Sequence, residues 1–298
     1  MPTVRGLLRG GLSLEALKEF VIAHRSSEST ISWNAIWGIN QRFIGRRTHR
    51  YMAFERERMV SVYIENMDKT EVEILRQPRR PEYGKRKVKV SKRLRISQED
   101  ALRIGSGSRP VNFVGLGRVA ICRVIKENEV VREVIGRLES ADGGPETNQE
   151  DYLNVIWLEA SNTAHARLYY HELLFERPIT DEKGDDLASC LNQESSRIGV
   201  DFYVERRLAS DLKKGEIIEL CGLGFFIHDY PYEVLLHKDL DKALTLFAIP
   251  DGTDDPGRYP SAVRPYKERL VNKIKDRERR EEEDQKKREE CASLAKSD

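Results

Sequence analysis

The sequence has 298 residues, with 51 basic and 50 acidic side chains and a formal net charge of +1. A chain this close to neutral has no overall field that attracts polyanions, so a nucleic-acid site must come from basic residues gathered in one place. The four cysteines, Cys122, Cys190, Cys221 and Cys291, are too far apart for a disulfide framework or a paired-cysteine zinc site. No apolar run approaches the roughly 18 residues that span a bilayer, and we expect a cytoplasmic protein of about two domains without a membrane partner.

Two helices are predicted near the start of the chain. Ser13 is a suitable N-cap, and Leu14, Leu17 and Phe20 follow it at helical spacing. A second helix is expected from about Ser32 to Ile44, where apolar and aromatic side chains share one stripe. Together the two stretches predict a helical hairpin.

Short strands are predicted from about residue 50 onward. Apolar residues alternate with polar ones in Val60-Ser61-Val62-Tyr63-Ile64, and further short apolar runs follow, mostly separated by Gly, Asp or Asn. Many short strands at such spacing suggest barrels or sandwiches. The small, polar segment 141–145 is the best internal boundary, and a turn-rich segment after residue 252 is expected to end the globular part. Residues 253–298 are predicted to form a charged tail, partly helical or disordered.

The strongest physical signal is a basic segment. Between Arg76 and Arg95 the chain has ten basic residues and the single acid Glu82. Clustered cations neutralise phosphates and release counterions, so this density favours a nucleic-acid backbone as the partner. The alternative is a solvated edge strand, because lysines that alternate with valines commonly protect a sheet edge. A smaller cluster, Arg206 and Arg207 followed by Lys213 and Lys214, is either a second binding patch or ordinary surface.

The residues indicate no catalytic centre. The six histidines form neither an H-E-x-x-H zinc motif nor an H-x-G-H adenylate-binding motif. The acidic residues around Gly184 lack the spacing of a calcium loop. We therefore predict no catalytic residue, no metal ligand and no cofactor in this chain.

Several blocks carry a resemblance to a known family. They are Pro2-Thr3-Val4-Arg5-Gly6, the segment Ile36–Ile44 running into Arg50-Tyr51-Met52-Ala53, Glu99-Asp100-Ala101, Val155-Ile156-Trp157-Leu158 and Phe247–Gly252. In this order they resemble the C-terminal, anticodon-binding half of glutamyl-tRNA synthetases of the archaeal and eukaryotic type, within the class I glutamyl and glutaminyl family. The pair Trp37 and Asn40 favours the glutamyl branch, whereas parts of 168–195 resemble the glutaminyl branch.

The resemblance implies a mainly β fold with N-terminal helices and two β-barrels of the kind seen in ribosomal protein L25. It places a helical connector at 1–48, a proximal barrel at 49–140 completed by 241–252, and a distal barrel at 141–240. The segment 44–50 departs from the family pattern, so the entry into the first barrel is less certain there. The ATP- and Mg²⁺-binding catalytic domain of the family would precede residue 1, and this chain alone is expected to bind tRNA(Glu) and catalyse nothing.

The resemblance also implies a set of tRNA contacts. Arg79, Arg80, Lys85, Arg86 and Lys87 fall in the family's basic loop at the anticodon stem-loop, and Arg5 and Arg9 near the inside corner of the tRNA. To these the basic clusters add Lys92, Arg93, Arg206, Arg207, Lys213 and Lys214. The tail is a candidate site for a multi-synthetase or scaffold partner. The alternatives are a stand-alone RNA-binding or scaffold protein and the corresponding part of a glutaminyl-tRNA synthetase.

Overall fold

The computed structural model describes residues 3–25, 33–107, 109–140, 152–171, 197–230 and 243–253, together with a few residues between 259 and 279. The chain divides into two compact units, Met1–Gly252 and Thr253–Asp298. Most of the predicted charged tail lies outside the described residues, as do the parts 172–196 and 231–242 of the predicted distal barrel. The first unit contains all the elements described below.

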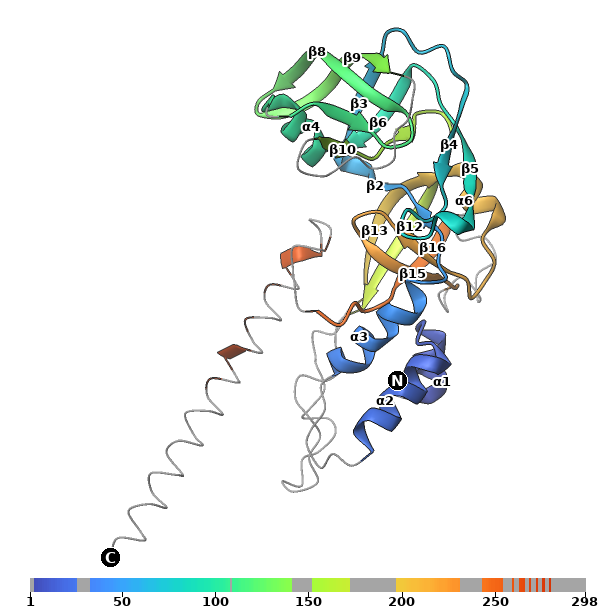
Figure 1. Ribbon diagram of the computed structural model, residues 1–298. Helices are drawn as coiled ribbons and strands as arrows, with labels where there is room; N and C mark the ends of the chain where they lie inside the picture. Colours follow the sequence, from blue (N-terminus) through green and yellow to red (C-terminus); the bar gives the residue numbers. More distant parts are fainter. Residues whose placement is uncertain are drawn as a thin grey trace, which may run out of the picture. The chain divides into compact units, whose positions relative to one another are not determined.

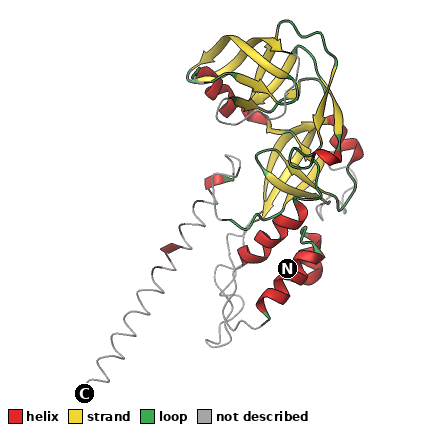
Figure 2. Cartoon of the chain, viewed as in Figure 1, coloured by secondary structure: helices red, strands yellow, loops and turns green. Residues whose placement is uncertain are grey.

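The fold class predicted from the sequence is confirmed. Helices open the chain and strands make up most of the rest (Figures 1 and 2). The helices are α1 (Val4–Arg9), α2 (Leu14–His24), α3 (Trp33–Ile44), α4 (Gln98–Gly105) and α6 (Arg206–Asp211), with short 3-10 turns η1 (Arg56–Arg58) and η2 (Pro81–Tyr83). The strands are β1 (Arg50–Tyr51), β2 (Ala53–Glu55), β3 (Met59–Ile64), β4 (Glu71–Leu75), β5 (Lys85–Lys89), β6 (Arg93–Ser97), β7 (Val111–Phe113), β8 (Gly117–Glu127), β9 (Val130–Ser140), β10 (Leu153–Val155), β11 (Leu158–Glu159), β12 (Thr163–His171), β13 (Arg197–Glu205), β14 (Ile217–Leu220), β15 (Gly224–His228) and β16 (Leu244–Ala248).

The N-terminal helices begin at side-chain caps. Ser13 Oγ accepts a hydrogen bond of 3.1 Å from the Ala16 amide, so the predicted helix starts where the sequence places it. Thr3 caps α1 in the same way, since its Oγ1 accepts a hydrogen bond from the Gly6 amide. The apolar periodicity of the sequence did not indicate this short helix. Buried Asn40 on α3 then joins the two helices, since its amide accepts from the Ser13 backbone amide at 2.8 Å and donates to the Gly11 carbonyl at 3.0 Å.

The strands form two seven-stranded mixed sheets and a two-stranded ribbon. Sheet A has the order β1-β14-β15-β16-β12-β13-β2, and sheet B has the order β10-β7-β8-β9-β3-β6-β11. The ribbon consists of β4 and β5. In Figure 1 the ribbon lies beside the lower sheet, sheet A, although its neighbours in sequence, β3 and β6, belong to the upper one.

This grouping of strands differs from the predicted division at residue 141. Sheet A combines β1 and β2 with the strands between residues 163 and 248. Sheet B consists of the strands within residues 59–64, 93–97, 111–140 and 153–159. The closing strand β16 pairs with β12 and β15, and not with strands of 59–140. The reason is that the chain leaves sheet A at η1, after only β1 and β2, and returns to it after β11.

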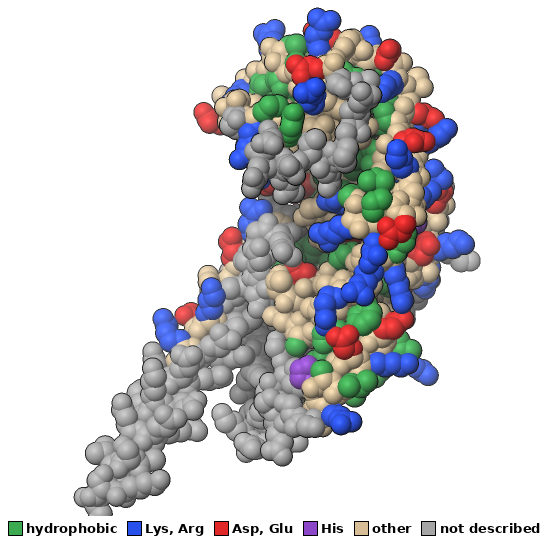
Figure 3. All heavy atoms as spheres, in the orientation of Figure 1, with side chains coloured by type: hydrophobic (Ala, Val, Ile, Leu, Met, Phe, Trp, Pro, Cys, Tyr) green, Lys and Arg blue, Asp and Glu red, His purple; other side chains and the backbone are tan. Residues whose placement is uncertain are grey.

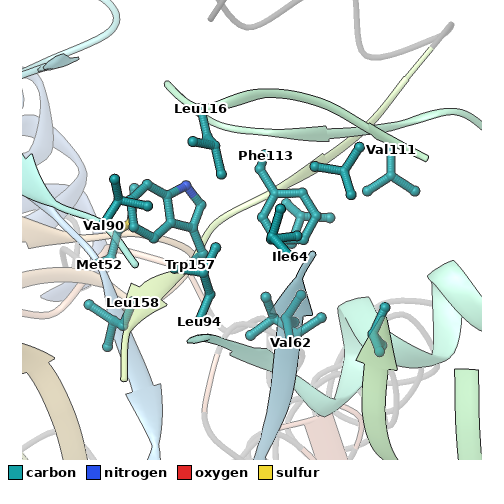
Figure 4. Close-up of a cluster of buried hydrophobic side chains, with 14 of the residues drawn as sticks. Met52, Val62, Ile64, Val90, Leu94, Val111, Phe113, Leu116, Trp157 and Leu158 are labelled. Carbon is teal, nitrogen blue, oxygen red and sulfur yellow. The ribbon is translucent and has the colours of Figure 1, made fainter. Parts of the chain in front are cut away.

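The largest core cluster lies under sheet B and continues along the ribbon. Trp157, Phe113 and Leu116 are fully buried there, and Trp157 Nε1 donates to the Val114 carbonyl at 2.9 Å (Figure 4). Val72, Ile74 and Val88 of the ribbon belong to the same cluster, which also includes Met52, Phe54 and Cys221. Burial of apolar side chains therefore fixes the ribbon against both sheets.

Candidate nucleic-acid interface

The predicted basic segment is largely the β4–β5 ribbon and the loop that joins its strands. The two strands pair in antiparallel register, with Glu71 opposite Lys89, Glu73 opposite Lys87 and Leu75 opposite Lys85. Alternation along a strand sends successive side chains to opposite faces. One face of the ribbon is therefore buried, and the other carries the exposed lysines.

The exposed face of the ribbon is of mixed charge. Lys85, Lys87 and Lys89 share it with Glu71 and Glu73, and Lys85 Nζ lies 3.8 Å from a carboxylate oxygen of Glu73. Directly opposed charges of opposite sign attract across a strand pair. The net positive charge of this face is consequently smaller than a count of the residues from Arg76 to Arg95 implies.

The loop 76–84 presents the arginines of the basic segment to solvent. Arg79 is exposed, and Arg80 is half-exposed with its guanidinium 3.2 Å from Glu82. The loop is held at its base, because Gln77 Nε2 donates to the Thr48 carbonyl at 3.3 Å and to Glu219 Oε2 at 2.9 Å. The ribbon thus places two arginines at a defined position beside β1 and β14.

Arg86 is the member of the predicted contact set that the structure places inside the protein. Its side chain is 4% exposed and forms two hydrogen bonds with Glu205, at 2.6 and 2.7 Å. Its guanidinium also donates to the Arg50 carbonyl at 3.1 Å and lies 5.0 Å from the ring centroid of Tyr51. Arg86 is therefore withdrawn from the surface, because alternation puts it on the same face as Val88. The prediction of Arg86 as a phosphate contact does not fit this burial.

Glu205 is the carboxylate that makes the burial of Arg86 possible. Besides the two guanidinium bonds, it accepts a hydrogen bond of 3.1 Å from the Met52 amide. Burial raises the pKa of Glu205, while the guanidinium and the Met52 amide oppose that rise. The pair links β5 of the ribbon to the end of β13 in sheet A.

Two other predicted residues, Arg9 and Lys214, converge on Asp229. Arg9 Nε lies 2.5 Å from Asp229 Oδ2, and Lys214 Nζ lies 3.3 Å from Asp229 Oδ1. Burial acts to raise the pKa of Asp229, but hydrogen bonds from Arg9, the Tyr230 amide and Lys214 hold it below its usual value. Lys214 also lies 5.7 Å from the ring centroid of Tyr230. Helix α1 and the turn before β14 are thereby joined at one carboxylate.

His49 contacts both the loop 76–84 and strand β14 of sheet A. Its carbonyl accepts a hydrogen bond from Glu219 at 3.0 Å, and its ring lies edge-on to Tyr83 at 6.1 Å between centroids. Partial burial lowers the pKa of His49, and the charges of Arg76 and Arg86 lower it further. Both causes disfavour the protonated form of this imidazole.

The remaining predicted residues lie at separate places. Arg206 and Arg207 are exposed at the start of α6, directly after Glu205, and Arg207 Nε pairs with Asp211 Oδ2 at 2.8 Å. Lys92 and Arg93 are exposed at the far end of β5, where β6 of sheet B begins. Arg5 is exposed on α1. In Figure 3 blue and red side chains are interspersed on the face shown, in keeping with these ion pairs.

Sequence reasoning missed Asp229, Glu205 and His49. Glu205 is the last residue of β13 and Asp229 directly follows β15, and no local pattern in the sequence distinguishes these buried acids from exposed ones. Only the pairing of distant strands brings Arg86 to Glu205 and Arg9 to Asp229. The sequence did contain a signal for the two acids of β4 that lie opposite the lysines of β5. Glu71 and Glu73 alternate with apolar residues there, which places both on the exposed face of the strand.

Comparison with known proteins gives a family match for the segment that contains the ribbon. Residues 48–139 match the family model of the anticodon-binding domain of class I tRNA synthetases for E and Q. The chain contains the anticodon-binding domain of that synthetase family. The matched segment includes the whole ribbon, its loop and the buried Arg86.

Individual relatives extend the similarity over most of the chain. A bifunctional glutamate/proline-tRNA ligase of Mus musculus is 31% identical over 260 residues, which are 84% of this chain and 16% of that protein. A probable cytoplasmic glutamate-tRNA ligase of Enterocytozoon bieneusi is 26% identical over 246 residues, 79% of this chain and 37% of that protein. The cytoplasmic glutamate-tRNA ligase of Arabidopsis thaliana is 24% identical over 257 residues, 84% of this chain and 34% of that protein. The chain therefore spans between about a sixth and somewhat over a third of these relatives.

The described residues show neither a metal-binding cluster nor a membrane-spanning helix. No group of three or more His, Cys, Asp and Glu side chains suited to a metal ion occurs among them. Within the same part of the chain, no helix has the length and apolar character needed to cross a bilayer.

Proposed function

We propose that this chain is the tRNA-recognition portion of a glutamate-tRNA ligase and binds the anticodon stem-loop of tRNA(Glu). The observation that carries the proposal is the match of residues 48–139 to an anticodon-binding domain, since this segment contains the ribbon and its exposed arginines. The names of the relatives, which are glutamate-tRNA ligases, support the choice of tRNA.

The proposed contact surface is the sequence-predicted set without Arg86. Its centre is the loop 76–84 with Arg79 and Arg80, flanked by the lysines of β5. Arg9, Lys213 and Lys214 extend this contact surface. Arg9 and Lys214 lie close together because both pair with Asp229. Phosphate contacts of this kind fix the position of an RNA and supply affinity that depends on salt. The outer members of the set are Arg5, Lys92, Arg93, Arg206 and Arg207.

We assign to these 298 residues the binding of tRNA and not the activation of glutamate. The sequence printed above contains no H-x-G-H motif. ATP and Mg²⁺ would be bound by the catalytic domain of a full-length ligase, as the family resemblance implies. We likewise propose a cytoplasmic location, which the names of two relatives support, and a multi-synthetase partner for the charged tail, which the bifunctional relatives suggest.

A filter-binding titration over salt concentration tests the proposal. The triple variant Arg79→Glu, Arg80→Glu and Lys87→Glu should bind a tRNA(Glu) transcript more weakly, with a salt slope reduced by about 1 for each lost phosphate contact. The control variant Arg118→Glu, Arg132→Glu and Arg137→Glu changes the net charge equally on exposed residues of β8 and β9. Equal loss in both variants would mean that only total charge matters, and the assignment of the ribbon would fail.

A further inference from the structure

Asp229 differs from three other acids that pair with residues of the proposed contact surface. Its side chain is 10% exposed, whereas the side chains of Glu73, Glu82 and Asp211 are more than half exposed. The two cations that pair with Asp229 are themselves more than half exposed. An RNA that approaches this part of the surface therefore meets the cations first, and the carboxylate lies behind them.

The backbone fixes the Asp229 carboxylate at the end of β15. The Tyr230 amide donates a hydrogen bond of 2.8 Å to Asp229 Oδ1. The residue before it, His228, accepts a hydrogen bond of 2.8 Å at its carbonyl from the Gly215 amide. This bond holds the turn that carries Lys214 against the end of β15. Lys214 Nζ can then reach Asp229 Oδ1, at 3.3 Å.

Helix α1 brings Arg9 to the same carboxylate from the other end of the sequence. Arg9 is the last residue of α1, and its Nε lies 2.5 Å from Asp229 Oδ2. Two residues later the Gly11 backbone packs against Ile249, so closely that a Cβ atom on Gly11 would lie 2.4 Å from Ile249 Cδ1. The end of α1 is therefore held against sheet A independently of the ion pair.

The ion pairs with Asp229 use only part of the donors of each cation. An arginine has five N–H donors, and Arg9 directs the one on Nε to the carboxylate. The other four belong to the terminal nitrogens of a side chain that is 62% exposed. The Lys214 ammonium has three donors, and its side chain is 54% exposed. Two cations from distant parts of the chain thus lie side by side, each with donors left for a phosphate.

We propose that Asp229 is a positioning residue that makes Arg9 and Lys214 one phosphate-binding unit. Long side chains that become ordered only when a ligand binds lower the affinity for that ligand. Paired with Asp229, these two are ordered when the protein folds. The inference rests on the proposed function and adds the group that orders two of its cations. The ligand of the unit is a phosphodiester of the RNA backbone.

A count of charges makes the opposite prediction for Asp229. Its carboxylate bears a negative charge next to two cations, so its removal raises the net positive charge of this surface. By charge alone, that change would strengthen binding to a polyanion. If the carboxylate orders the two cations, its removal weakens binding instead. The sign of the change in affinity therefore distinguishes the two roles.

A filter-binding titration with a tRNA(Glu) transcript measures this sign. We expect Asp229→Asn to bind about tenfold more weakly than wild type, because two long side chains must then be ordered on binding. The control Asp211→Asn makes the same substitution at an exposed acid that pairs with Arg207. This control should bind as tightly as wild type or more tightly. Circular dichroism checks that both variants are folded.

A double-mutant cycle in tRNA affinity gives a readout that a general effect on the fold would not change. Arg9→Gln and Lys214→Gln replace exposed side chains, and the cycle measures the coupling between them. With Asp229 in place, the double variant should lose about fivefold less affinity than the two single losses combined, because the cations act as one unit. In the Asp229→Asn background the losses should be additive. The first cycle remains informative if Asp229→Asn does not fold.

The outcomes separate the two proposals. The positioning role is refuted if Asp229→Asn binds as tightly as wild type or more tightly, or if Asp211→Asn loses as much affinity as Asp229→Asn. Additive losses for Arg9→Gln and Lys214→Gln in the otherwise wild-type chain refute it as well. In each of these cases the proposed function stands, provided that the wild-type chain binds tRNA(Glu) with a salt slope that depends on Arg79 and Arg80. If the chain does not bind tRNA(Glu), both proposals fail.

Discussion

Arg86 of β5 and Glu205 of β13 form a buried ion pair, with nitrogen to oxygen distances of 2.6 and 2.7 Å. The pair joins the β4–β5 ribbon to sheet A, although the strands on either side of the ribbon in the chain belong to sheet B. Gln77 fixes the ribbon at a second point through Thr48 and Glu219. The position of the exposed Arg79 and Arg80 is therefore set by buried contacts.

Replacing one member of this pair should destabilise the protein strongly. We expect Arg86→Met to reduce the free energy of unfolding by about 3–5 kcal/mol, because it leaves the Glu205 carboxylate buried without its partner charge. The double variant Arg86→Met with Glu205→Leu should recover much of that loss, since no uncompensated charge remains. Urea unfolding followed by circular dichroism measures both. Arg79→Met, at an exposed position, serves as the control and should change stability by no more than about 0.5 kcal/mol.

The local elements could be predicted from the sequence, because their causes are local. Ser13 and the apolar residues after it define the start of α2, and alternation in Val60–Ile64 defines β3. Which strands pair was not predictable in this way. The partners of β16 are β12 and β15, and nothing in Leu244–Ala248 itself specifies either of them.

The same limit applies to the candidate site. A count of charges from Arg76 to Arg95 treats all ten basic residues as equivalent, whereas the strand register separates them. Lys85 and Lys87 face Glu73, and Arg86 turns inward beside Val88. The role of Arg86 depends on Glu205, more than a hundred residues later, so composition alone indicated the region but not which side chains are accessible.

Gly252 should be intolerant of any side chain. It has φ of +74°, and a Cβ atom there would lie 2.5 Å from the Gly38 amide nitrogen and 2.7 Å from the Asn34 carbonyl oxygen of α3. Gly222 has the same φ of +74° but has no atom within 4 Å of the corresponding Cβ position. We expect Gly252→Ala to lower the midpoint of urea unfolding clearly more than Gly222→Ala, which bears only the strain of the left-handed backbone, about 1–2 kcal/mol. Equal shifts would show that the backbone contact with α3 adds nothing.

Asn40 should be needed for the geometry of the N-terminal helices. Its side chain is fully buried and satisfies one donor, the Ser13 amide, and one acceptor, the Gly11 carbonyl. Asn40→Leu leaves both backbone groups without their partner, and each such group costs about 1–3 kcal/mol. Asn40→Asp keeps an acceptor for Ser13 but cannot donate to Gly11 when ionised. Thermal unfolding should therefore show both variants destabilised, and a variant as stable as wild type would contradict this account.

His49 should make stability depend on pH in the weakly acidic range. Burial, with Arg76 and Arg86 nearby, lowers its pKa in the folded protein below the ordinary value of 6.5. As the pH falls through about 6.5, the unfolded chain binds a proton that the folded protein still excludes, so stability contributed by neutral His49 is lost towards lower pH. His49→Gln removes this group, and its unfolding free energy should fall less than that of wild type between about pH 7.5 and about pH 5.5. The other histidines are common to both proteins, so the difference in slope reports His49 alone. Parallel slopes would mean that the two arginines and the partial burial do not shift the imidazole.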